Sequence, residues 1–280
     1  MIGAILGDII GSIHEFKGTK TKDFELITQR DHFVTDDTYM TLAVAKAVLE
    51  AQNDFLKLEA LAHRYLLEIG RAYPAGYGSR FKAWLKSPDP QPYFSYGNGA
   101  PMRISACGIA YDTLEDVKKA VHAVTVVTHN HPEGLKAAEA VAVAIYYLRR
   151  GFSKYELRQV MQPYYNLYTN LERIRPFYRF TEEARYTVPQ AILAFLESTD
   201  FEDAIRNAVS LGGDADTLGA ITGSLAEAYY GVPESLYKNV EPFLQGEDLK
   251  TILHAFQRQY PTQVQPDVFY DEPLVFERRT

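Results

Sequence analysis

The chain contains one cysteine, fewer basic than acidic residues and no long uncharged apolar run. Cys107 has no second cysteine with which to form an internal disulfide, and a free thiol is typical of the reducing cytoplasm. The net charge of −7 disfavours strong electrostatic binding of nucleic acid, which depends on basic side chains. A membrane-spanning helix needs about 20 apolar residues. We therefore expect no membrane-spanning segment and no membrane partner.

The segment 1–10 is apolar, but it lacks a basic stretch and contains Asp8. It therefore predicts a short buried helix rather than a signal peptide. Hydrophobic residues make up 46% of the chain, which is enough for a large core, and no Pro/Ser-rich linker divides it. We expect a single domain over residues 1–280, present as a monomer in the cytoplasm.

Helical patterns recur along the whole chain, whereas strand patterns are sparse. Besides the first segment, helices are expected at 38–52, 54–71, 115–128, 132–150, 153–162, 188–198, 202–211, 217–230 and 247–258. The stretches 71–101 and 163–187 are rich in aromatic residues and proline, so they are interpreted as turns, and the tail from Pro261 as irregular. The sequence thus predicts an all-α, multi-helix fold.

Glycines recur every fourth residue in the first predicted helix, at Gly3, Gly7 and Gly11. Glycine weakens a helix, so this spacing indicates one face that packs closely against another helix. Glu15 follows at the end of the same helix, where the helix dipole disfavours a carboxylate. A metal ion or a substrate is a candidate for the compensating partner.

Two short acidic motifs are far apart in the sequence: 35–38 (Thr-Asp-Asp-Thr) and 212–217 (Gly-Gly-Asp-Ala-Asp-Thr). Each precedes an alanine-rich helix, so either one alone is typical of an ordinary N-cap. Together they offer four carboxylates and two hydroxyls, a set of hard oxygen ligands that suits Mg²⁺, Mn²⁺ or Ca²⁺ rather than zinc. Because buried carboxylates need compensating charge, we predict that folding joins both motifs in one two-metal site.

Two further stretches are candidate ligand-binding loops. The first is 93–103, where glycines flank Asn98 and would let backbone N–H groups approach an anion, although Asn-Gly is also a routine turn. Within it, Tyr96 offers a ring for stacking, and Arg103 could pair with a phosphate or with an internal carboxylate. The second contains His129 and His131, for which a structural or ligand-contacting role fits better than metal ligation.

Taken in order, these stretches resemble the ADP-ribosylglycohydrolase family, typified by the dinitrogenase-reductase-activating glycohydrolase. The resemblance runs from the first helix to about Gly231. It implies a compact all-α bundle whose cleft holds two Mg²⁺ or Mn²⁺ ions, and a substrate carrying ADP-ribose. By the same resemblance, the metal ligands are Thr35, Asp36, Asp37, Asp214, Asp216 and Thr217. The substrate-binding residues that it implies are Ser95, Tyr96, Gly97, Asn98, Gly99 and His129, with Glu15 near the metals and the scissile bond.

The resemblance implies hydrolysis at C1″ of the distal ribose, which reverses ADP-ribosylation. As a hypothesis, carboxylates stabilise an oxocarbenium-like centre while Glu15 or Asp36 takes the proton of the attacking water. A non-catalytic ADP-ribose-binding module and a two-metal nucleotide phosphoesterase are the alternatives. The sequence leaves the acceptor open among arginine, serine, a nucleobase and O-acetyl-ADP-ribose. The loop between Glu15 and Thr35 is short, and in some relatives this loop covers the substrate.

Overall fold

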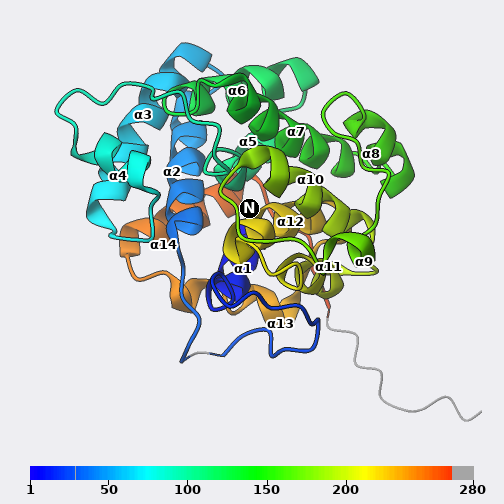
Figure 1. Ribbon diagram of the computed structural model, residues 1–280. Helices are drawn as coiled ribbons and strands as arrows, with labels where there is room; N and C mark the ends of the chain where they lie inside the picture. Colours follow the sequence, from blue (N-terminus) through cyan, green and yellow to red (C-terminus); the bar gives the residue numbers. More distant parts are fainter. Residues whose placement is uncertain (29, 267–280) are drawn as a thin grey trace, which may run out of the picture.

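The computed structural model describes residues 1–28 and 30–266 and is mostly helical (Figure 1). The longer helices are α1 (Ile2–Ser12), α2 (Asp36–Ala51), α3 (Phe55–Ala72), α6 (Leu114–Val126), α7 (Pro132–Leu148), α8 (Lys154–Met161), α10 (Ala184–Leu196), α11 (Phe201–Val209), α12 (Ala215–Tyr230) and α14 (Glu247–Gln259). These confirm the helices expected from the sequence and the all-α class. No helix within the described ranges is long and apolar enough to cross a membrane.

Short helices account for most of what the sequence pattern missed. They are α4 (Ser79–Lys86), η1 (Pro101–Arg103), α5 (Ser105–Ala110), α9 (Leu171–Ile174), α13 (Glu234–Tyr237) and η2 (Glu241–Phe243). The interpretation of 71–101 and 163–187 as turns is therefore wrong at α4 and α9, and at the start of α10. Helices this short carry too few periodic positions to stand out in the sequence.

The tail from Pro261 is not wholly irregular. Strand β2 (Val264–Gln265) pairs in parallel with β1 (Val232–Pro233), and the backbone N–H of Val232 donates to the carbonyl of Gln263 at 2.8 Å. The remainder of that predicted tail, 267–280, lies outside the described residues.

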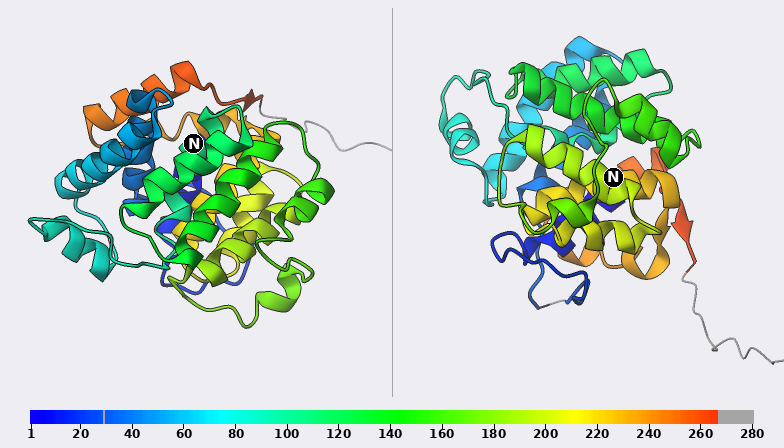
Figure 2. Two further views of the ribbon diagram at one scale, coloured as in Figure 1. Left: turned by 90° about the horizontal axis from the view of Figure 1, so that it is seen from above. Right: turned by 45° about the vertical axis from the view of Figure 1, so that its right-hand side comes forward.

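Helix α1 lies inside the molecule and packs along α12, and α2 contacts both helices (Figures 1 and 2). All residues of α1 are buried. A Cβ atom on Gly7 would lie only 1.9 Å from the carbonyl oxygen of Gly219, and Gly3 and Gly11 face α12 in the same close manner. The predicted packing role of these glycines is confirmed. The contact places Asp8 of α1 close to the start of α12, where the second acidic motif lies.

Candidate active site

The first acidic motif forms the N-terminus of α2. Thr35 is the N-cap, and its hydroxyl oxygen accepts a hydrogen bond from the backbone N–H of Asp37 at 3.2 Å. The capping interpretation of this motif therefore holds locally. The second motif differs, because Asp214 occupies the N-cap of α12 without making a side-chain capping bond. Its Oδ2 instead accepts from Nδ2 of Asn98 at 2.8 Å. The Asp214 side chain thus points toward the loop 95–99 and the cleft.

Asp8 ties the first motif to α1. This fully buried carboxylate accepts from the backbone N–H and the hydroxyl of Thr35 at 2.9 and 2.7 Å. It also accepts from the backbone N–H of Thr38 at 3.1 Å and from the Thr38 hydroxyl. Burial raises the pKa of Asp8 to about 7, and the nearby Asp216 carboxylate adds to the shift. Asp8 is a site residue that the sequence reasoning did not select, because a single aspartate in an apolar helix belongs to no motif that would mark it as functional.

Folding brings the two acidic motifs together, as predicted. The Thr217 hydroxyl donates to Oδ2 of Asp37 at 3.2 Å, although the two residues are 180 positions apart. One carboxylate oxygen each from Glu15, Asp214 and Asp216 lie within 4.8 Å of one another. Oδ1 of Asp37 is buried and has no hydrogen-bond partner. The site therefore gathers carboxylates from three segments and leaves acceptor atoms unused.

Burial and mutual repulsion raise the pKa values of these carboxyls. The pKa of Glu15 is raised to about 8, first by burial and then by Asp216, and that of Asp36 to about 6, first by burial and then by Asp8. The pKa values of Asp37, Asp214 and Asp216 are also raised, with burial as the largest cause. No Lys or Arg within the described ranges forms an ion pair with any of them. Lys82 offsets only part of the rise in the pKa of Asp36, so most of the cluster's negative charge is uncompensated by described residues and fits divalent cations bound by hard oxygen ligands.

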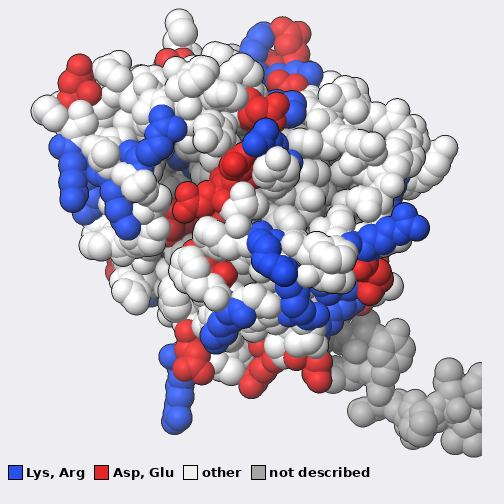
Figure 3. Space-filling view, viewed as in Figure 1, with Lys and Arg blue, Asp and Glu red and all other residues white. Residues whose placement is uncertain are grey.

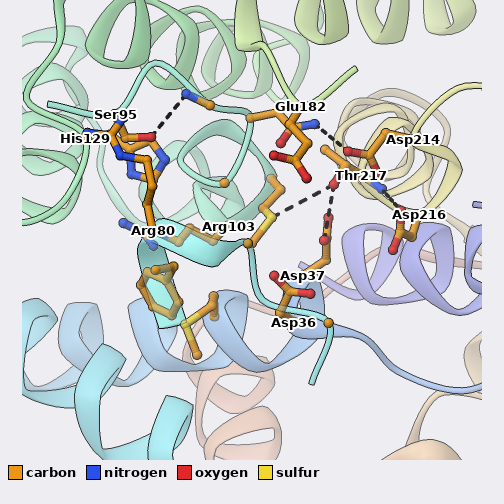
Figure 4. Close-up of a pocket in the computed structure, with 18 of the residues that line it drawn as sticks. Asp36, Asp37, Arg80, Ser95, Arg103, His129, Glu182, Asp214, Asp216 and Thr217 are labelled. Atoms are coloured by element: carbon orange, nitrogen blue, oxygen red, sulfur yellow. Dashed lines mark hydrogen bonds between the residues drawn. The ribbon is translucent and has the colours of Figure 1, made fainter. Parts of the chain in front are cut away.

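The carboxylates lie at one side of a cleft (Figure 4). In the space-filling view, acidic side chains form a stripe across this face of the molecule, with Lys and Arg on both sides (Figure 3). Of the loop predicted to bind substrate, Ser95, Gly97, Asn98 and Gly99 line the cleft. Tyr96 does not line it; its ring lies 5.4 Å from that of His131. The predicted loop and the acidic cluster thus line one cleft.

The predicted histidine His129 also lines the cleft, across from the acidic cluster and beside Ser95 (Figure 4). Its neighbour His131 caps α7, because Nδ1 accepts from the backbone N–H of Glu133 at 3.0 Å. Of the two roles left open by the sequence, structural or ligand-contacting, the capping contact of His131 is the structural one. The cleft also contains residues that the sequence reasoning did not single out, among them Arg80, Phe180 and Glu182. These lie in stretches interpreted as turns, where no periodic pattern marked them.

The sequence and the fold are similar to those of known proteins. The sequence model of the family described as ADP-ribosylglycohydrolase matches residues 1–264. The chain is similar to the human ADP-ribosylhydrolase ARH3, with 26% identity over 92% of this chain and 93% of that protein. It is also similar to the ADP-ribosyl-[dinitrogen reductase] glycohydrolase of Rhodospirillum rubrum, with 25% identity over 83% and 85%. A solved structure titled "ADP-ribosylglycohydrolase-related protein complex" matches with a TM-score of 0.67 and 27% identity, over 92% of this chain and 97% of that one.

The fold, the acidic cleft and these matches together define a hydrolase of the glycohydrolase type. This chain belongs to the ADP-ribosylglycohydrolase family. The family and its relatives support an ADP-ribosyl glycohydrolase activity for it.

Proposed function

We propose that this protein is a divalent-metal-dependent hydrolase that removes ADP-ribose from an ADP-ribosylated acceptor by cleaving the glycosidic bond at C1″ of the distal ribose. The observation that carries the proposal is the group of largely buried carboxylates at one end of the cleft, none of which forms an ion pair with a described Lys or Arg. The proposed ligands of two Mg²⁺ or Mn²⁺ ions are Thr35, Asp36, Asp37, Asp214, Asp216 and Thr217. When bound, such ions supply positive charge and hold vicinal ribose hydroxyls.

Several neighbours orient this ligand set. Asn98 fixes one oxygen of Asp214, and the Thr217 hydroxyl fixes one oxygen of Asp37, which leaves the buried Oδ1 of Asp37 free to ligate. The Thr35 hydroxyl gives its proton to Asp8 and accepts one bond from the backbone of Asp37, which leaves one lone pair for a cation. These bonds reduce the number of orientations that the ligands sample before a cation binds.

For the chemical step we propose Glu15 and Asp36 as the groups that handle protons. Both line the cleft beside the cluster, and either one can take the proton of the water that attacks C1″. The surrounding carboxylates stabilise the positive charge that develops at C1″ as the acceptor leaves. The loop 95–99 and His129 hold the diphosphate and adenosine portion at the other end of the cleft.

A substrate panel tests the proposal. ADP-ribose linked to arginine, serine, a nucleobase or an acetyl group is incubated with Mg²⁺ or with Mn²⁺, and the products are identified by mass spectrometry. We expect free ADP-ribose from at least one substrate, and loss of turnover with EDTA. Release of AMP or phosphate would favour a phosphoesterase, and tight ADP-ribose binding without turnover of any substrate would favour a binding module.

Matched variants connect the chemistry to the cluster. Asp36→Asn and Asp214→Asn keep the side-chain volume but remove a charge, so we expect a loss of turnover of about a thousandfold and weaker Mn²⁺ binding. Asp112→Asn is the control, because the Asp112 side chain is fully exposed. Full activity of the two cluster variants, or of the wild type in EDTA, would contradict the metal mechanism.

A further inference from the structure

Arg103 is buried in the wall of the cleft without a carboxylate partner in the described chain. Its residue exposure is 1%, and its guanidinium Nη2 donates to Oγ1 of Thr128 at 2.7 Å. Buried arginines are normally paired with an acid. None of the ion pairs in residues 1–28 and 30–266 includes Arg103, and burial lowers its pKa to about 10, which still leaves it charged at neutral pH. This charge is therefore available to act on its neighbours and on a ligand.

The Thr128 hydroxyl links Arg103 to His129. Oγ1 of Thr128 lies 2.8 Å from Nδ1 of His129, and all three side chains are buried. A guanidinium only donates hydrogen bonds, so Thr128 Oγ1 must accept from Arg103. Oγ1 keeps a second lone pair, but its own buried proton has no other acceptor among the described residues. The hydroxyl therefore donates to Nδ1 of His129, because the reverse direction would leave a buried O–H without a partner. A neutral imidazole that accepts at Nδ1 carries its proton on Nε2. The hydrogen-bond partners thus assign the tautomer.

Nε2 of His129 lies against the loop predicted to bind substrate. A Cβ atom on Gly99 would lie 3.4 Å from Nε2, and one on Gly97 would lie 3.8 Å from it. Nε2 has no hydrogen-bond partner among the described residues, and His129 lines the cleft. Burial lowers the pKa of His129 well below its usual value, and the charges of Arg103 and Arg80 lower it further. The ring is therefore neutral and presents one N–H.

We infer that Arg103 and Thr128 are positioning residues that fix His129 as a neutral Nε2–H donor to the diphosphate of the ligand. The assignment of the diphosphate rests on the proposed function. It is supported by the division of charge in the cleft: Arg80 and Arg103 lie on the side of His129, whereas Asp214 and Asp216 lie on the other side (Figure 4). An anionic group binds at the positive end, where a fixed N–H donor adds a hydrogen bond assisted by the phosphate charge.

The test combines spectroscopy with binding of ADP in EDTA, which reports on the diphosphate end without the metals. In ¹⁵N-histidine NMR of the wild type, we expect His129 as the Nε2–H tautomer with no titration between about pH 5 and 8. Thr128→Val removes the hydroxyl, so we expect a mixture of tautomers and about tenfold weaker ADP binding. Thr128→Ser restores the hydroxyl and both properties. Signals are assigned with His129→Gln.

Thr125→Val is the matched control. Thr125 is one turn earlier in α6 and equally buried, but its hydroxyl has no hydrogen-bond partner. We expect it to leave the His129 tautomer and the ADP affinity unchanged. A wild-type ring that is protonated on Nδ1 or charged at neutral pH would overturn the inference, as would equal ADP affinity of Thr128→Val and Thr128→Ser. If the wild type has the expected tautomer but binds neither ADP nor ADP-ribose, the proposed function fails and only the positioning of His129 remains.

Discussion

Replacement of Gly7 by alanine tests whether the contact between α1 and α12 supports the site. The new Cβ atom would lie 1.9 Å from the carbonyl oxygen of Gly219, whereas ordinary contact begins at about 3.4 Å. Backbone cannot rotate away as a side chain can, so the two helix axes must separate. Overpacking usually costs about 1–3 kcal/mol and occasionally more, and a clash this close to backbone atoms falls at the upper end, at about 3–4 kcal/mol. The higher helix propensity of alanine returns about 1 kcal/mol. We expect a net loss of about 2–3 kcal/mol in the free energy of unfolding.

The assay is urea denaturation followed by circular dichroism, with Gly70→Ala as the control. Gly70 is also a buried helical glycine, but its added Cβ would meet only the end of the Leu85 side chain, at 2.7 Å from Cδ2, and this side chain can move. We expect Gly70→Ala to change the stability by less than about 1 kcal/mol. Equal stability of Gly7→Ala and wild type, or equal losses in the two variants, would refute the reasoning. Mn²⁺ titration of both variants then reports whether separation of α1 from α12 also weakens Mn²⁺ binding by the acidic cluster.

Three further outcomes follow from the described structure. Burial raises the pKa values of the carboxyls of Asp8, Glu15 and Asp36 to about 6–8, above their values in the unfolded chain. Folding therefore takes up protons in this pH range. As a result, the cation-free protein should lose stability as pH rises from about 4 to 8. Mn²⁺ should therefore raise the melting temperature more at pH 8 than at pH 5, and an equal rise at both would contradict this. Cys107 is buried, and burial raises the pKa of its thiol. A thiol reagent at pH 8 should therefore modify Cys107 only after the protein unfolds. Rapid labelling of the native protein would contradict this, because it requires an exposed thiolate. Asp8→Asn places an amide donor opposite the N–H and hydroxyl donors of Thr35 and Thr38. This should lower the free energy of unfolding by about 2–3 kcal/mol and weaken Mn²⁺ binding. If urea denaturation gives the same unfolding free energy and titration the same Mn²⁺ affinity as wild type, Asp8 has no positioning role.

The sequence was most informative where a local pattern has a direct structural meaning. The spacing of Gly3, Gly7 and Gly11 predicted a close helix contact, because only the absence of Cβ atoms explains such a repeat inside a helix. The two acidic motifs predicted a shared site, because buried carboxylates need a common source of countercharge. Both inferences rest on energetic costs that a few residues reveal by themselves.

Contacts that depend on the tertiary arrangement could not be predicted in this way. Tyr96 stands inside the glycine loop, yet its ring lies against His131 outside the cleft. Arg103 was left between a phosphate and an internal carboxylate, and the structure gives it a third partner, the Thr128 hydroxyl. Glu182 reaches the cleft from a stretch without periodicity. Each of these outcomes is decided by how helices pack, which no short pattern encodes.

The packing of α1 on α12 also sets the order in which this chain can fold. Helix α1 is mostly apolar and buried on every side, so it is not stable alone in water, and the helix that covers it begins at Ala215. During synthesis the first helix must wait until more than two hundred further residues have left the ribosome. Contacts between such distant segments form late and slow the folding reaction. The two halves of the acidic site are also far apart, with Asp37 and Thr217 separated by 180 positions, so the site can assemble only after the chain has been made past Thr217.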